Sequence, residues 1–185
     1  MVAAVTMVGL RRLNIGCGDY RLPAGWTNVD ESNPNADIQI HVPPLPWDAA
    51  SVAEIYAGHF FEHLGRIEAA WFLDECYRVL IPGGKLGILV PDMREVLNRY
   101  VHDEPAPMEF PEGHQRDLRD LDDLCEVILF STAQASTHSW AYDKFTLSRT
   151  LTRAGFKVIG EIDRYHDPRV AVGAWYQFGL EASKP

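Results

Sequence analysis

Residues 11–30, with the sequence RRLNIGCGDYRLPAGWTNVD, decide the fold. Leu13 to Ile15 are typical of a short buried strand that runs into a tight turn at Gly16-Cys17-Gly18, and a second strand from Trp26 to Val29 ends at Asp30. Glycine adopts positive φ and has no Cβ, so a ligand can lie directly on its backbone. A carboxylate at the end of the next strand can accept both hydroxyl protons of a ribose. The stretch therefore predicts a nucleotide or nucleoside site.

The spacing within this stretch restricts the ligand. Eleven residues separate Gly18 from Asp30, and Pro23 and Gly25 lie among them, which leaves no room for a three-turn crossover helix. A dinucleotide fingerprint needs a third glycine and an acidic residue about 20 positions further on, and a pyrophosphate favours a helix N-terminus. A cofactor with a ribose but no phosphate fits better, and the short spacing disfavours a nicotinamide dehydrogenase.

Length and composition set further bounds. At 185 residues we expect a single domain over residues 1–185, with an acceptor-side insertion at about 103–142. The net charge of −9 argues against nucleic-acid and anionic-membrane partners, because phosphate contacts need clustered Lys and Arg. Three widely separated cysteines and an apolar N-terminus without a basic leader predict reduced thiols and a cytoplasmic location. The sequence does not indicate an oligomeric state.

Strand-like and helix-like segments alternate along the rest of the chain. The periodicity predicts strands at 37–42, 54–58, 85–90, 156–162 and 172–182, and helices at 67–80, 93–102, 115–130 and 145–154. Residues 81–84, Ile-Pro-Gly-Gly, are expected to stop the helix at 67–80. The class is α/β with a mainly parallel sheet, a shortened first crossover, and antiparallel last strands because no helix links them.

Several segments in order carry a resemblance to a known family. LNIGCG, the strand end VD, the LPW loop, EIYAGHFFEHL, YRVLIPGGKLGILVPD and LTRAGFKVI together resemble small class I S-adenosylmethionine (SAM)-dependent methyltransferases. The closest likeness is to a compact, methyltransferase-11-like bacterial group with a Pro-x-Gly-Trp segment soon after the glycine turn. The resemblance is dense from Leu13 to about Asp92 and looser from Trp140 to Ala182. It implies a Rossmann-like sheet with helices on both faces, and SAM as the cofactor.

The resemblance also assigns cofactor-binding roles. It implies that the glycine turn holds the methionine part of SAM, that the carboxylate at the strand end binds the ribose, and that the loop before the LPW segment contacts the adenine. The end of the fourth strand would lie beside the methionine carboxylate and the methyl group. These roles fall, in that order, on Gly16, Cys17 and Gly18; on Asp30; on His41, Val42 and Leu45; and on Gly58 and His59. Asn14 stands where the family often has an acidic residue that meets the cofactor ammonium. Val42 stands near a position that is often an aspartate.

Methyl transfer from a sulfonium mainly requires alignment, with a general base if the acceptor is a hydroxyl. His59 is the candidate base at the strand end, and the alternative is that it caps the next helix or packs against the cofactor. His138 is a second catalytic candidate. Trp140 and Tyr142 are candidates for binding the acceptor, or else for packing their loop onto the core. The resemblance suggests a small-molecule or glycan acceptor.

Two other interpretations remain to be weighed. Residues 59–63, His-Phe-Phe-Glu-His, match the H-x-x-E-H string of inverted zinc peptidases, which needs both histidines on one helical face and a third ligand elsewhere. Here the string directly follows a strand, so we expect no metal. Cys17 is expected to be a small side chain that suits the turn, not a nucleophile. The uncharged Asn14 and Val42 keep open a second function, a non-catalytic nucleoside- or cofactor-binding protein.

Overall fold

The computed structural model describes residues 10–102, 138–162 and 175–185. Most of the expected insertion at 103–142 and the whole expected helix at 115–130 lie outside the described residues. No helix in the described ranges is long and apolar enough to cross a membrane.

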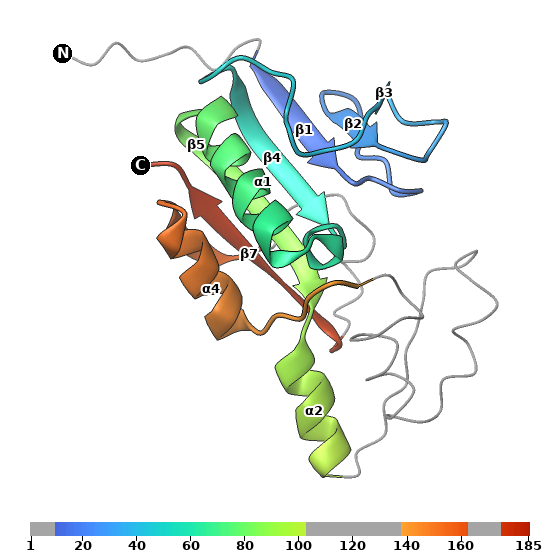
Figure 1. The fold of residues 1–185 in the computed structure, drawn as a ribbon, viewed down its shortest axis with the longest axis vertical. Coiled ribbons are helices and arrows are strands. Elements are labelled where there is room, and N and C mark those ends of the chain that lie inside the picture. Colours follow the sequence, from blue (N-terminus) through green and yellow to red (C-terminus); the bar gives the residue numbers. More distant parts are fainter. Residues whose placement is uncertain (1–9, 103–137, 163–174) are drawn as a thin grey trace.

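A seven-stranded sheet forms the centre of the molecule, in the order β3-β2-β1-β4-β5-β7-β6 (Figure 1). The strands are β1 Arg11–Ile15, β2 Thr27–Asp30, β3 Ile38–Gln39, β4 Val52–Gly58, β5 Leu80–Pro91, β6 Lys157–Glu161 and β7 Gln177–Ser183. The neighbours from β3 to β5 pair in parallel, whereas β7 is antiparallel to both β5 and β6. The predicted mainly parallel sheet with antiparallel last strands is confirmed.

The helices lie in the predicted places. They are the 3₁₀ turn η1 Phe61–His63, α1 Arg66–Val79, α2 Met93–Val101 and α4 Lys144–Arg153. Asp92 caps α2 by accepting from the backbone N–H of Arg94 and Glu95, and Asp143 caps α4 by accepting from that of Thr146. Residues 16–26, which link β1 to β2, contain no helix, so the shortened first crossover is also confirmed.

Three predicted boundaries are wrong. The last strand, expected to start at residue 172, starts at Gln177, because Trp175 and Tyr176 form a turn. The strand expected at 37–42 contains only the two residues of β3, because the Asp37 carboxylate turns back to accept from the backbone and side-chain N–H groups of Asn28 at 2.8 and 2.9 Å. The expected stop at 81–84 is instead part of β5, which starts directly after α1. Val52 pairs with Leu80 and Glu54 pairs with Lys85, so one residue of β4 faces the four residues 81–84 of β5, and the Pro-Gly-Gly segment forms a bulge inside the strand.

The hydrophobic core lies mainly on one face of the sheet. Alternate residues of β1, β4, β5 and β7 point to this face and meet the buried stripe of α1 together with Leu147 and Leu151 of α4. The opposite face carries a smaller cluster of Leu22, Tyr56 and Leu89, in which Leu22 comes from the short crossover. In the described ranges, helices therefore supply core side chains to one face, and the second helical layer expected from the resemblance is not among them.

Candidate functional site

The strand order places the candidate site at one edge of the sheet. The chain runs outward from β1 in two directions, to β2 and β3 on one side and to β4 and β5 on the other, so the topological switch lies between β1 and β4. In open α/β sheets a ligand crevice forms at the carboxyl ends of the strands at such a switch. The glycine turn, Asp30, His59 and η1 all follow the carboxyl ends of these strands, which point the same way in Figure 1.

The two glycines of the turn are required for different reasons. Both adopt the left-handed conformation, with φ of 63° at Gly16 and 48° at Gly18. A Cβ on Gly16 would lie 2.3 Å from the ring of Phe60, so that position is needed for packing. A Cβ on Gly18 would meet no atom of the described residues within 4 Å. Gly18 is therefore the position where bare backbone faces open space that a ligand can occupy.

Asp30 lies directly beside this bare backbone. The N–H of Gly18 donates to Asp30 Oδ2 at 2.8 Å, while Oδ1 accepts from the N–H groups of Ser32 and Asn33, both at 2.9 Å. Burial raises the pKa of the Asp30 carboxyl, but these hydrogen bonds outweigh it and leave the pKa below its ordinary value. Asp30 is thus an ionised carboxylate, and a carboxylate oxygen with one donor can still accept a ribose hydroxyl.

Asn14 and Cys17 are buried next to the turn. Asn14 Nδ2 donates to the backbone oxygen of Tyr20 at 3.0 Å and to Asn28 Oδ1 at 2.9 Å. Asn14 Oδ1 is buried without a hydrogen-bond partner in the part of the chain that the structure describes. Burial, reinforced by the charge of Asp30, raises the pKa of the Cys17 thiol to about 11. Cys17 is therefore a neutral thiol at physiological pH, as its expected role in the turn requires.

The three residues expected near the adenine are not equivalent. The side chains of Val42 and Leu45 are only 6% and 2% exposed and belong to the main hydrophobic core. His41 lies at the surface, with Nδ1 2.8 Å from Glu31 Oε2, and this hydrogen bond and the Glu31 charge raise its pKa. Of the three side chains, His41 alone is accessible to a ligand, and Val42 and Leu45 could offer only backbone groups.

His59 follows Gly58 at the end of β4 in a strained conformation. Its φ is 51°, which a side chain with a Cβ adopts at a cost of roughly 1–2 kcal/mol. Its Nδ1 lies 3.1 Å from Glu62 Oε1 and its Nε2 lies 2.6 Å from Gln177 Oε1. Both ring nitrogens therefore have protein partners, so His59 could accept a proton from a substrate only after releasing one of them.

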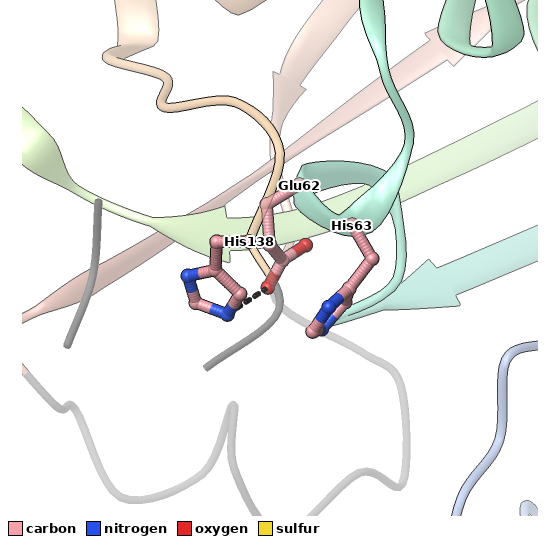
Figure 2. A group of neighbouring side chains, drawn as sticks. All are labelled: Glu62, His63 and His138. Carbon is pink, nitrogen blue, oxygen red and sulfur yellow. Dashed lines mark ion pairs between the residues drawn. The ribbon is translucent and has the colours of Figure 1, made fainter. Parts of the chain in front are cut away.

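His138 lies next to the 3₁₀ turn that follows β4. Figure 2 shows the Glu62 carboxylate between the imidazole rings of His63 and His138. His138 Nε2 is 3.9 Å from Glu62 Oε1, and the rings of the two histidines are 4.7 Å apart between centroids. The predicted catalytic histidines thus meet at one carboxylate, which His59 contacts from β4 and His138 from a segment far along the chain.

Trp140 and Tyr142, which follow His138 in the chain, lie in different surroundings. Tyr142 is 5% exposed and stacks on Phe61 with ring centroids 5.1 Å apart. Trp140 is 44% exposed, with the Arg66 guanidinium 5.3 Å from its ring centroid. Both line a groove of about 330 Å³ between α1 and α4, and Tyr142 also lines a hollow of about 530 Å³ beside α2. Tyr142 therefore packs its loop onto the core, and Trp140 is the accessible one of the pair.

Comparisons with known proteins show similarity in structure but not in sequence. No protein-family model matches the chain, and no curated protein matches it in sequence. Among solved structures, a SAM-dependent methyltransferase from Thermotoga maritima superposes with a TM-score of 0.60 at 16% identity, over 95% of this chain and 82% of that one. SAM-dependent methyltransferases from Aquifex aeolicus and Mesorhizobium loti both give TM-scores of 0.52 at 15% identity, over 96% and 95% of this chain and 83% and 91% of theirs.

The chain has the class I SAM-dependent methyltransferase fold. This confirms the Rossmann-like architecture that the resemblance implied. The sequence predicted that the glycine turn, Asp30 and His59 lie together, and the structure places all three at the carboxyl ends of β1, β2 and β4. The sequence missed Phe60, which covers Gly16, and Gln177, which holds His59. The only sequence signal for Phe60 is its place in the His-Phe-Phe-Glu-His string at 59–63, and no signal links Gln177 to His59, which is 118 positions away.

Proposed function

We propose that the chain binds SAM at the carboxyl edge of β1, β2 and β4 and transfers its methyl group to an acceptor. The observation that supports this most strongly is the pairing of Gly18 with Asp30. Bare backbone in open space and an ionised carboxylate are joined by a 2.8 Å hydrogen bond, at the switch point of a methyltransferase fold. The two groups suit the two ends of a nucleoside with an amino-acid tail.

The residues present fit this cofactor. Asp30 would hold the ribose hydroxyls, the turn from Gly16 to Gly18 would hold the methionine part, and the orphaned Asn14 Oδ1 would accept from its ammonium group. His41 would lie on the adenine side. SAM supplies a methyl group already activated on a sulfonium, so the protein needs no covalent nucleophile. The neutral thiol of Cys17 agrees with this requirement.

The chain's own contribution to the reaction would be alignment. Holding two reactants at near-attack distance can be worth roughly 7–11 kcal/mol. His59 would be oriented by Glu62 and Gln177, and it would act as a base only if Gln177 moved away. We further propose a small molecule or a glycan as the acceptor. The net charge of −9 supports an acceptor other than nucleic acid.

The function is tested by titration calorimetry with SAM and with S-adenosylhomocysteine. We expect saturable heat with about one site per chain for both compounds. The absence of heat at millimolar concentration would contradict the proposal. An acceptor library then separates catalysis from simple binding, because an enzyme releases S-adenosylhomocysteine above background with at least one acceptor.

A second candidate function is a cofactor-binding protein without catalysis. It is favoured by one specific observation, that both ring nitrogens of His59 are engaged by protein groups. Calorimetric binding without product release from any acceptor, in the chain and in a Gln177→Ala variant that frees His59 Nε2, would favour this candidate. Turnover that rises in Gln177→Ala would favour catalysis with His59 as base.

A further inference from the structure

Glu62 is a buried carboxylate whose surroundings are incomplete. Its side chain is 1% exposed. Its Oε1 contacts His59 at 3.1 Å, but its Oε2 is buried with no hydrogen-bond partner among the described residues. A buried charged oxygen without a partner is costly, and proteins rarely keep one unless a ligand, ion or water satisfies it. Oε2 therefore points to a partner that the described residues do not supply.

Two imidazoles lie beside this carboxylate. Glu62, His63 and His138 each offer one ligand atom, and these atoms all lie within 4.8 Å of one another. In Figure 2 the three side chains converge from two segments, the turn after β4 and the start of the segment at 138. A carboxylate and two imidazoles form a donor set that zinc commonly uses in sites with an open position.

The backbone holds the two segments together. The carbonyl oxygen of Glu62 accepts from the N–H groups of Ser139 at 2.8 Å and Trp140 at 3.0 Å, the two residues that follow His138. Phe61 and Tyr142 stack on each other in the same region. These contacts bring His138 to Glu62 without depending on the side chains of either residue. The donor set is therefore positioned in advance by main-chain hydrogen bonds and packing.

A further shell of partners orients the carboxylate. His59 contacts Glu62 Oε1, and Gln177 in turn contacts His59 at 2.6 Å. Partners of this kind typically fix the orientation of metal-binding carboxylates and histidines. The arrangement differs from the zinc-peptidase pattern in the sequence, because His59 faces Glu62 and Gln177 while His138 joins His63.

We propose that Glu62, His63 and His138 bind one divalent transition-metal ion, with zinc as the best match to the ligand types. Two imidazoles disfavour Mg²⁺ and Ca²⁺, which prefer oxygen ligands. Ligand atoms of one tetrahedral zinc ion lie roughly 3.4 Å apart, as follows from bond lengths of about 2.1 Å. The 3.9 Å between His138 Nε2 and Glu62 Oε1 is close to this value, and side-chain rotation would bring in the farthest atom.

The test uses the full chain without a histidine tag. After dialysis against a chelator, the protein is titrated with Zn²⁺ in competition with a chromophoric indicator, and bound zinc is measured by elemental analysis. We expect one zinc ion per chain. Co²⁺ bound at the same site should give the visible absorption of a low-symmetry, four- or five-coordinate ion. A chain that retains no stoichiometric zinc overturns the proposal.

Single substitutions test which residues bind the zinc ion. His138→Ala should weaken zinc binding by about 10- to 100-fold or more, because loss of an outer partner alone has an effect of that size. Glu62→Gln keeps the shape of the side chain and should weaken binding similarly. His102→Ala, at the exposed residue that follows α2, is the matched control and should bind zinc as the parent does.

Folding is checked by circular dichroism. If Glu62→Gln does not fold, His138→Ala and His63→Ala decide the outcome. Equal zinc affinity in the parent and in folded His138→Ala overturns the proposal. Zinc binding is measured without SAM, so its outcome is independent of the proposed methyl transfer.

Discussion

Asp30 and Glu62 are carboxylates at the same edge of one sheet, but the protein stabilises them in different ways. Asp30 accepts hydrogen bonds from Gly18, Ser32 and Asn33, all within a dozen residues of it. Glu62 is more deeply buried, and its partners include His138, 76 positions away, while its Oε2 has no hydrogen-bond partner within the described ranges. The hydrogen bonds of Asp30 thus come from residues close to it in sequence, whereas Glu62 depends on distant segments and, by our inference, on a metal ion.

The largest loss of stability is expected when Glu62 loses His59, its nearest hydrogen-bond partner. In metal-free protein, His59→Ala leaves a buried carboxylate without its hydrogen-bonded partner, and breaking a buried pair in this way costs about 3–5 kcal/mol. Urea unfolding measures the change in the free energy of unfolding. His102→Ala, an exposed histidine, is the control and should change it little. A loss below about 1 kcal/mol in His59→Ala would show that Glu62 is stabilised by other means.

A second comparison is made between the two glycines. Gly16→Ala combines the strain of positive φ, about 1–2 kcal/mol, with a clash against Phe60. We therefore expect the free energy of unfolding to fall by about 2–4 kcal/mol. Gly18→Ala introduces the strain alone and should lower the free energy of unfolding by about 1–2 kcal/mol. Its new methyl group would also enter the space proposed for the cofactor and weaken cofactor binding. Denaturant unfolding and calorimetry with S-adenosylhomocysteine measure the two effects. Equal stability losses would contradict the different roles given to these positions.

The next prediction concerns the role of Asp30 in cofactor binding. Asp30→Ala should weaken binding of S-adenosylhomocysteine by about 1–3 kcal/mol, the scale for losing charged hydrogen bonds. Asp48→Ala removes an exposed carboxylate near the amino edge of β4 and serves as the control. Calorimetry is carried out at a temperature where both variants are folded. Unchanged affinity in Asp30→Ala would place the ribose elsewhere.

The smallest effect is expected far from both carboxylates, at the cap of α4. Asp143→Ala should reduce stability by about 1 kcal/mol at neutral pH, because its carboxylate caps the helix. Hydrogen bonds from Thr146 outweigh the opposing effect of burial and lower the pKa of Asp143 from 3.8 to about 2. Its contribution is therefore complete above pH 3.8 and lost as the pH falls toward 2. Urea unfolding of parent and variant between neutral pH and pH 3 measures this, and a difference that grows on acidification would contradict the assignment.

The same contrast explains how much could be predicted from sequence. The strand, glycine turn and second strand around Asp30 were predictable because their hydrogen bonds join residues close in sequence. The bulge at Pro82-Gly83-Gly84 was not, because glycine and proline signal a turn equally well inside or outside a strand. The meeting of Glu62 with His138 was not predictable either, since it depends on backbone contacts between segments that only the tertiary fold brings together.

Side-chain roles along the adenine loop show a further limit. Val42 and Leu45 carry no pattern that separates a ligand contact from a core residue, and the structure places both in the core. His41 could be distinguished only by its partner Glu31, which β3 brings alongside. The sequence thus located the loop but not which of its side chains face outward.

The central claim is most directly tested by a crystal structure of the chain with S-adenosylhomocysteine. The account predicts the ribose hydroxyls within hydrogen-bonding distance of the Asp30 carboxylate and the amino-acid tail against the Gly18 backbone. A ligand bound elsewhere, with Asp30 still bonded only to Gly18, Ser32 and Asn33, would contradict it.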